Sequence, residues 1–122
     1  MPHFRFMDLE IWKESIALNN QLFDLADVFG DVKNFRVAEQ LRGASLSISN
    51  NIAEGSGSAS SKDFANFLNI ARRSVFETAN ISFVAFNRKL IDKKQLDQIL
   101  ENLDSISRKI TNFRKSLLTQ SA

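Results

Sequence analysis

The apolar residues of this chain recur at helical spacing in four long segments, and almost nothing in the sequence would interrupt a helix. The only proline is Pro2, and the 122 residues contain four glycines. Proline and glycine are the residues that most often end a helix, so their scarcity favours long, continuous helices. No competing strand pattern is present. The sequence therefore predicts an all-α fold.

The periodic segments predict helices over residues of about 9–29, 35–54, 61–90 and 94–118. The connections between them are short, which favours antiparallel neighbours. A chain of this length is the right size for one domain. We therefore expect an antiparallel up-down-up-down four-helix bundle that forms a single domain over residues 1–122.

Several residues carry the signals of helix ends. Asp8 is a candidate N-cap for the first helix, and Gly30 is the expected stop. Gly55 is placed to end the second helix as a C′ residue in the left-handed conformation. Residues 60–63 (SSKD) and 92–95 (DKKQ) match capping boxes that would open the third and fourth helices.

The glycine-rich run GSGSAS at residues 55–60 invites comparison with a phosphate-binding loop. It lacks the GK[ST] ending of such a loop, and no strand precedes it. The run is therefore interpreted as the turn between two helices.

The first helix carries two apolar stripes on different faces. One contains Leu9, Trp12, Ile16 and Phe23, and the other contains Ile11, Leu18, Leu22, Leu25 and Phe29. A peripheral helix of a small monomer needs only one stripe of about 100°. We therefore expect the bundle to bury one stripe and the other to form an oligomer interface. The residues expected in that interface are Ile11, Leu18, Leu22 and Leu25. A helix embedded deeply in a monomer is the alternative.

Charge is distributed unevenly along the chain. The net charge is +2, yet residues 1–61 hold five Lys/Arg against eight Asp/Glu, and residues 62–122 hold eleven against six. This asymmetry indicates either a polyanionic partner or complementary packing between subunits. A third reading is that the cations complement the C-terminal dipoles of helices.

Basic pairs concentrate in the second half of the chain, and Lys/Arg contacts to phosphates give affinity without catalytic geometry. Lys93-Lys94 is one such pair. The candidate nucleic-acid-binding residues are Arg72, Arg73, Arg88, Lys89, Arg108, Lys109, Arg114 and Lys115. Phe67, Phe76, Phe83 and Phe113 lie on apolar stripes, so core packing is expected for them in preference to base stacking.

The sequence offers little to an enzyme. The only histidine is His3, near the N-terminus, and there is no cysteine. Glu39, Glu54 and Glu77 could meet in a bundle, but the Glu-x-x-His motifs of di-iron bundles are missing. We therefore expect no catalytic residue, metal, cofactor or small-molecule substrate. No secretory signal or bilayer-length apolar run is present, so a cytoplasmic, bacterial-type protein without membrane contact is expected.

The motifs QLR (40–42), NIAEG (51–55) and FANFLNIA (64–71) resemble those of a four-helix bundle family. Its members include proteins encoded in intervening sequences of bacterial 23S rRNA, often labelled S23 ribosomal proteins. The accessory proteins of diversity-generating retroelements have a similar fold. Gly43 and Ser58 stand where basic residues are frequent in the family, and Arg73 stands where glycine is usual.

This resemblance implies a pentameric barrel of bundles with a basic surface that binds nucleic acid and, in the retroelement proteins, a reverse transcriptase. It does not imply a structural component of the ribosome. Two hypotheses follow for this chain. The first is a non-enzymatic homo-oligomer that binds RNA or DNA, or a nucleoprotein, through the basic third and fourth helices. The second is an adaptor that acts by self-assembly and protein contacts.

Overall fold

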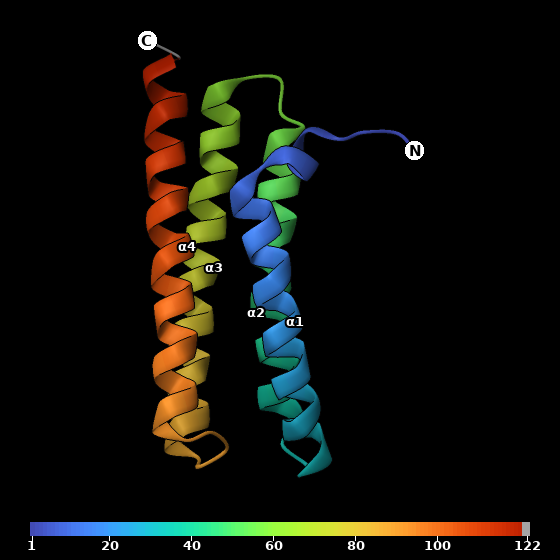
Figure 1. Ribbon diagram of the computed structural model, residues 1–122, viewed down its shortest axis with the longest axis vertical. Helices are drawn as coiled ribbons and strands as arrows, with labels where there is room; N and C mark the ends of the chain where they lie inside the picture. The colour runs from blue at the N-terminus through green and yellow to red at the C-terminus, as the bar shows by residue number, and fades with distance from the viewer. Residues whose placement is uncertain (121–122) are drawn as a thin grey trace.

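The computed structural model describes residues 1–120, which form the expected all-α, up-down-up-down four-helix bundle (Figure 1). A short 3-10 turn precedes the bundle, and no strand occurs within residues 1–120. The elements are η1 (Arg5–Asp8), α1 (Glu10–Asp31), α2 (Phe35–Ser56), α3 (Ser61–Asn87) and α4 (Lys93–Gln120). The α1–α2 and α3–α4 loops lie at one end of the bundle. The α2–α3 loop and the N-terminus lie at the other.

The core runs along the length of the bundle and draws on all four helices. Its largest fully buried side chains include Phe29 of α1, Ile48 of α2 and Phe64 of α3. The apolar positions of α4 recur in alternating steps of three and four, and the structure buries them along one edge. They are Leu96, Ile99, Leu103, Ile106, Ile110 and Leu117, and the half-buried Phe113 completes the series.

The expectation that the second stripe of α1 remains exposed for an oligomer interface is wrong. Ile11, Leu18 and Leu22 are buried inside the subunit, and Leu25 packs against the same core. The other stripe is half-buried at Leu9, Trp12, Ile16 and Phe23. Trp12 is covered partly by η1, where its ring lies 4.8 Å from that of Phe6. Both stripes are therefore used mainly within one subunit.

A polar cluster lies between α1 and α2 inside the bundle. The buried Asn19 donates from Nδ2 to Ser49 Oγ over 2.9 Å and accepts from Ser45 Oγ at 2.6 Å. Buried polar atoms destabilise a fold unless they form hydrogen bonds, and here the asparagine and the two serines form hydrogen bonds with one another. The serines of α2 therefore serve hydrogen bonding as well as close packing.

The structure confirms two of the expected helix-start signals. Ser60 accepts a hydrogen bond from the Asp63 backbone at the start of α3. At the start of α4, Asp92 and Gln95 form a reciprocal pair of hydrogen bonds. The amide of Asp92 donates to Gln95 Oε1, and the amide of Gln95 donates to Asp92 Oδ1. Asp8, in contrast, lies within η1, and Leu9 is the N-cap of α1.

The two glycines that were expected to end helices do not do so. Gly30 lies inside α1, and Gly55 lies inside α2; neither has a positive φ. Gly55 instead permits close packing, because a Cβ atom there would lie 2.7 Å from Phe67 Cβ and 2.8 Å from Phe64 Cδ1. The close approach of α3, rather than the backbone conformation, therefore requires glycine at this position.

The helices α1 and α3 end in the same motif, with a lysine where glycine is usual. Lys33 and Lys89 both have φ of 64°. After Lys33, the backbone amide of Asn34 donates a hydrogen bond to the carbonyl oxygen of Phe29. After Lys89, the backbone amide of Leu90 donates in the same way to the carbonyl oxygen of Ala85. This is the six-to-one bond of a Schellman motif. Residues other than glycine, asparagine or aspartate rarely adopt the left-handed backbone conformation.

Candidate nucleic-acid interface

Three of the four candidate cations on α4 are engaged within the subunit. Arg108 pairs with Asp104 one turn earlier at 3.0 Å. Arg114 donates from Nε to the carbonyl oxygen of Ala65 on α3 at 3.1 Å. Lys109 reaches across to α1. These three basic side chains, which the sequence predicted to bind nucleic acid, therefore make contacts within the subunit.

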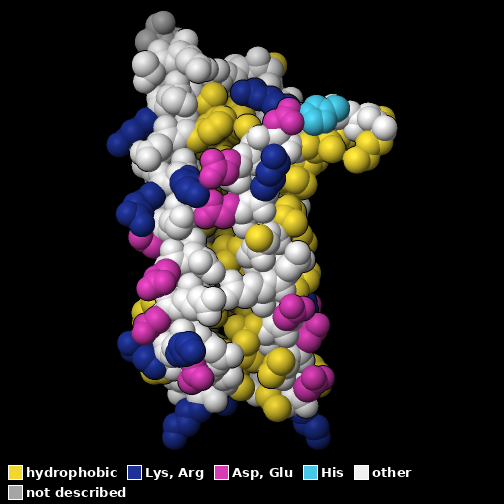
Figure 2. All heavy atoms as spheres, in the orientation of Figure 1, with side chains coloured by type: hydrophobic (Ala, Val, Ile, Leu, Met, Phe, Trp, Pro, Cys, Tyr) yellow, Lys and Arg dark blue, Asp and Glu magenta, His cyan; other side chains and the backbone are white. Residues whose placement is uncertain are grey.

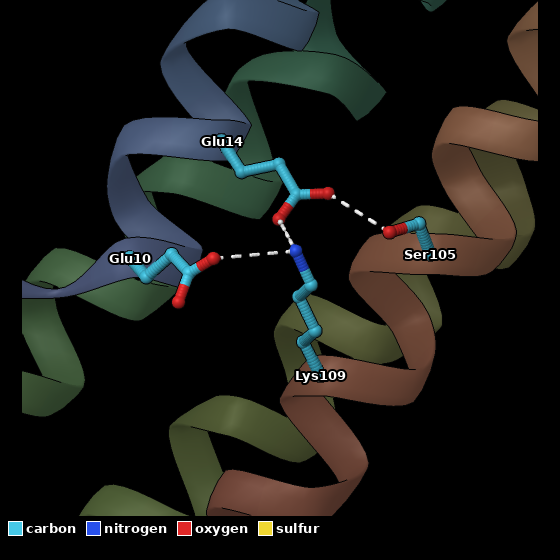
Figure 3. A network of polar contacts seen from close by, with 4 residues as sticks. All are labelled: Glu10, Glu14, Ser105 and Lys109. Atoms are coloured by element: carbon cyan, nitrogen blue, oxygen red, sulfur yellow. Dashed lines mark hydrogen bonds and ion pairs between the residues drawn. The ribbon is translucent and has the colours of Figure 1, made fainter.

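Lys109 stands at the centre of a polar network between α1 and α4 (Figure 3). Its Nζ lies 3.0 Å from Glu14 Oε2 and 3.4 Å from Glu10 Oε1. Ser105 Oγ donates to the other oxygen of Glu14 over 3.2 Å. The hydrogen bond to Glu14, and then that to Glu10, raise the pKa of Lys109 above its ordinary value. Lys109 therefore joins α4 to the acidic N-terminal half of the chain.

Arg42, within the QLR motif, makes a second clamp of this kind. Its guanidinium lies 2.6 Å from Asp27 of α1 and 2.6 Å from Glu39 of α2. The hydrogen bond to Asp27 is the largest cause that raises the pKa of Arg42. The motif arginine thus ties α2 to α1.

The remaining candidates are accessible to a partner. Arg72 lies over the ring of Phe76, with its guanidinium carbon 4.9 Å from the ring centroid. Within residues 1–120, no acidic side chain pairs with the exposed Arg73, Arg88, Lys89 or Lys115. These residues occupy the middle of α3, the α3–α4 loop and the last third of α4. The structure does not gather all eight candidates on one surface.

The fold brings two further cations beside some of these candidates. Lys33 lies in the α1–α2 loop and Arg36 in the first turn of α2, at the end of the bundle where Arg88 and Lys89 lie (Figure 1). Sequence reasoning missed Lys33 and Arg36 because they belong to the half of the chain that is acidic on balance. The up-down topology, which was predicted, is the signal that could have found them.

Two phenylalanines expected in the core lie at the surface. Phe76 is 58% exposed and Phe83 is 47% exposed, so the expectation of core packing is wrong for both. Phe67 and Phe113 are half-buried. Phe76 lines a shallow pocket between α3 and α4, together with Val75, Ala79, Leu100, Leu103, Asp104 and Ser107. This edge of α3 is an exposed apolar surface.

Two kinds of feature are absent from residues 1–120, namely a metal-binding cluster and a membrane-spanning helix. Across residues 1–120, no group of three or more His, Cys, Asp or Glu side chains is placed to hold a metal ion. None of the helices in this part of the chain combines the length and apolar character needed to cross a bilayer. His3 lies 2.7 Å from Asp8 on the exposed N-terminal segment.

Comparison with known proteins places the chain in a family. The family model of the 23S rRNA-intervening sequence proteins matches residues 7–112. The chain belongs to this family. The resemblance found in the sequence motifs is thereby confirmed.

A solved structure extends the likeness to the fold. A crystal structure of a protein with unknown function from the S23 ribosomal protein family of Bacteroides thetaiotaomicron VPI-5482 superimposes with a TM-score of 0.82. The alignment covers 86% of this chain and 98% of that chain at 24% identity. At this identity the likeness shows the fold alone. The comparison with curated proteins returned no match.

Proposed function

We propose that this member of the 23S rRNA-intervening sequence protein family is a non-enzymatic, cytoplasmic protein that binds structured nucleic acid through exposed cations on α3, on α4 and in the loop between them. The observation that carries the proposal is the set of exposed basic side chains at Arg73, Arg88, Lys89 and Lys115, for which residues 1–120 supply no acidic partner. Cations without acidic partners are free to contact phosphates and to release counterions from the nucleic acid.

The binding of a base-paired RNA hairpin, measured against salt, tests this proposal. Each phosphate that a lysine or arginine neutralises contributes about −0.9 to the slope of log K against log salt. Four such contacts predict a slope of about −3.6, which is a loss of roughly 150-fold between about 50 mM and 200 mM salt. No detectable binding at about 50 mM salt, or an affinity that barely changes with salt, would refute the proposal.

The exposed edge of α3 favours a second candidate function. Phe76 and Phe83 present large apolar side chains to solvent, which suits an adaptor that acts by self-assembly or protein contacts. Under this alternative the protein assembles without binding nucleic acid. The salt titration separates the two functions.

Homo-oligomerisation is part of the proposal under either function, and the number five comes from the family resemblance. Since the core takes up the Leu22 stripe, the α3 edge at Phe76 and Phe83 is the better interface. Light scattering of Phe76→Ser/Phe83→Ser should show a smaller mass than the unmodified protein. Ile70→Ser, at an exposed position on a different face of α3, is the matched control and should keep the full mass. A monomeric unmodified protein at micromolar concentration would refute assembly.

A further inference from the structure

We propose that the end of the bundle formed by the α1–α2 and α3–α4 loops is the principal phosphate-binding surface of this protein. This inference rests on the proposed function and locates its site. The surface, called the basic loop end, consists of Lys33, Arg36, Arg88, Lys89, Lys93 and Lys94. All six side chains are exposed. Figure 2 shows Lys and Arg side chains projecting from this end of the molecule, beneath both pairs of helices.

The charge of this end dominates the charge of the chain. The segments 29–36 and 86–95 hold six Lys/Arg against two Asp, a net charge of +4. The whole chain carries only +2, so its remaining residues together carry −2. The uneven charge along the sequence therefore becomes, in the fold, a positive potential at one end. Such a concentration of like charge raises the local concentration of polyanions.

Two of these lysines occupy backbone positions that disfavour lysine. Lys33 and Lys89 both lie in the left-handed region, where glycine would relieve steric strain. The same departure occurs in both loops that meet at this end. A strained residue that recurs at equivalent places points to a role for its side chain. The two side chains share a positive charge at the C-terminal end of a helix.

Three more cations sit where helix electrostatics favours acids. Arg36 lies in the first turn of α2, and Lys93 and Lys94 open α4. The positive end of a helix dipole lies in its first turn, where Asp and Glu are stabilising. Neither α2 nor α4 has an acid in its first turn, and Asp92, which precedes α4 and caps it, is the acid at the start of that helix. The complementing of helix dipoles therefore does not account for these three residues, whereas contact with phosphates does.

Ion pairing leaves most of this surface available. Lys93 pairs with Asp97 at 3.1 Å, and both groups are exposed. Within residues 1–120, no acid pairs with Lys33, Arg36, Arg88, Lys89 or Lys94. Lys109 of α4 is, in contrast, held by two glutamates of α1. Within residues 1–120, the loop end thus offers more unpaired cations than the C-terminal half of α4, and the phosphates of a nucleic-acid backbone are ligands for such cations.

The experiment compares two double variants with the same change of charge. Lys33→Gln/Lys89→Gln removes two charges from the basic loop end. Lys13→Gln/Lys62→Gln removes two exposed charges elsewhere and is the control. With a base-paired RNA hairpin as the probe, the loop-end variant should lose at least about tenfold in affinity at about 50 mM salt. Its salt slope should fall by about one unit for each lysine. The control should bind within about twofold of the unmodified protein.

A third variant separates charge from folding. Lys33→Gly/Lys89→Gly removes the charges and relieves the left-handed backbone, so its melting temperature should stay unchanged or rise while RNA binding falls as in the glutamine variant. Equal losses in the control, or wild-type binding by either loop-end variant, would overturn this inference and leave the proposed function standing. Failure of the unmodified protein to bind the hairpin, including the case where it binds phosphatidylserine vesicles instead, would overturn both.

Discussion

Gly55 allows the packing of α2 on α3 to be tested by adding a single methyl group. In an ordinary helix, replacement of an interior glycine by alanine is stabilising by about 1 kcal/mol. At Gly55 the new Cβ would lie 2.7 Å from Phe67 Cβ and 2.8 Å from Phe64 Cδ1. The ring atom of Phe64 can rotate away, but Phe67 Cβ is fixed to the backbone of α3. Relief of the clash therefore requires the two helices to separate.

The expected magnitude follows from these opposing effects. Overpacking a close-packed core costs about 1–3 kcal/mol, which exceeds the gain in helix propensity over most of that range. We expect Gly55→Ala to lower the free energy of unfolding by up to about 2 kcal/mol. At about 2.1 cal/mol/K of unfolding entropy per residue, this lowers the melting temperature by up to roughly 8 °C.

Gly43→Ala is the matched control, since Gly43 also lies inside α2 and a Cβ atom there would meet nothing within 4 Å. It should raise the free energy of unfolding by up to about 1 kcal/mol. Thermal unfolding followed by circular dichroism measures both variants. A rise of similar size for both would show that α3 does not approach Gly55 closely and would refute the packing argument.

Two further predictions concern α1 and its contacts. Leu22→Ala should lower the free energy of unfolding in urea by about 2–5 kcal/mol, because Leu22 is fully buried. Val28→Ala, at a position that is 52% exposed, is the control and should change this free energy little. Equal effects of the two variants would show that Leu22 is not buried in the core. For Lys109→Met, the loss of stability relative to the unmodified protein should be constant from neutral pH to the ordinary lysine pKa of 10.5. Because the folded pKa is raised, that difference should vanish as the pH passes above it, and a difference that persists at higher pH would exclude the ion pairs as its source.

The helices and their arrangement were predictable because they depend on information local to each segment. Apolar spacing defined all four helices, and the capping signals at Ser60 and Asp92 are satisfied by residues three positions away. The main difference in length is at α3, which ends at Asn87 rather than near residue 90. No glycine marks that end, since Lys89 occupies the left-handed position.

The errors concern contacts between helices. The two stripes of α1 are equally apolar in sequence, and only the neighbours decide which one faces the core. Asn19 lies beside the Leu22 stripe and finds its partners in Ser45 and Ser49 of α2. Those partners lie 26 and 30 residues away, so no local pattern reveals them. The prediction that Gly55 ends α2 was wrong for the same reason, because the atoms that require glycine there belong to α3.

The charge asymmetry of the sequence allowed either a polyanionic partner or complementary packing. In the structure, one group of cations pairs with acids of a neighbouring helix, and another group is left without such acids. Glu10 and Glu14 neutralise Lys109 across the seam between α1 and α4, which is packing within one subunit. Such pairing requires helices that lie side by side, and the ends of helices at the loops have fewer neighbours to supply acids. Five of the six cations at the basic loop end therefore have no acidic partner within residues 1–120, although two of them belong to the acidic half. A nucleic acid that approaches this end would meet the positive charge that the rest of the fold has not neutralised.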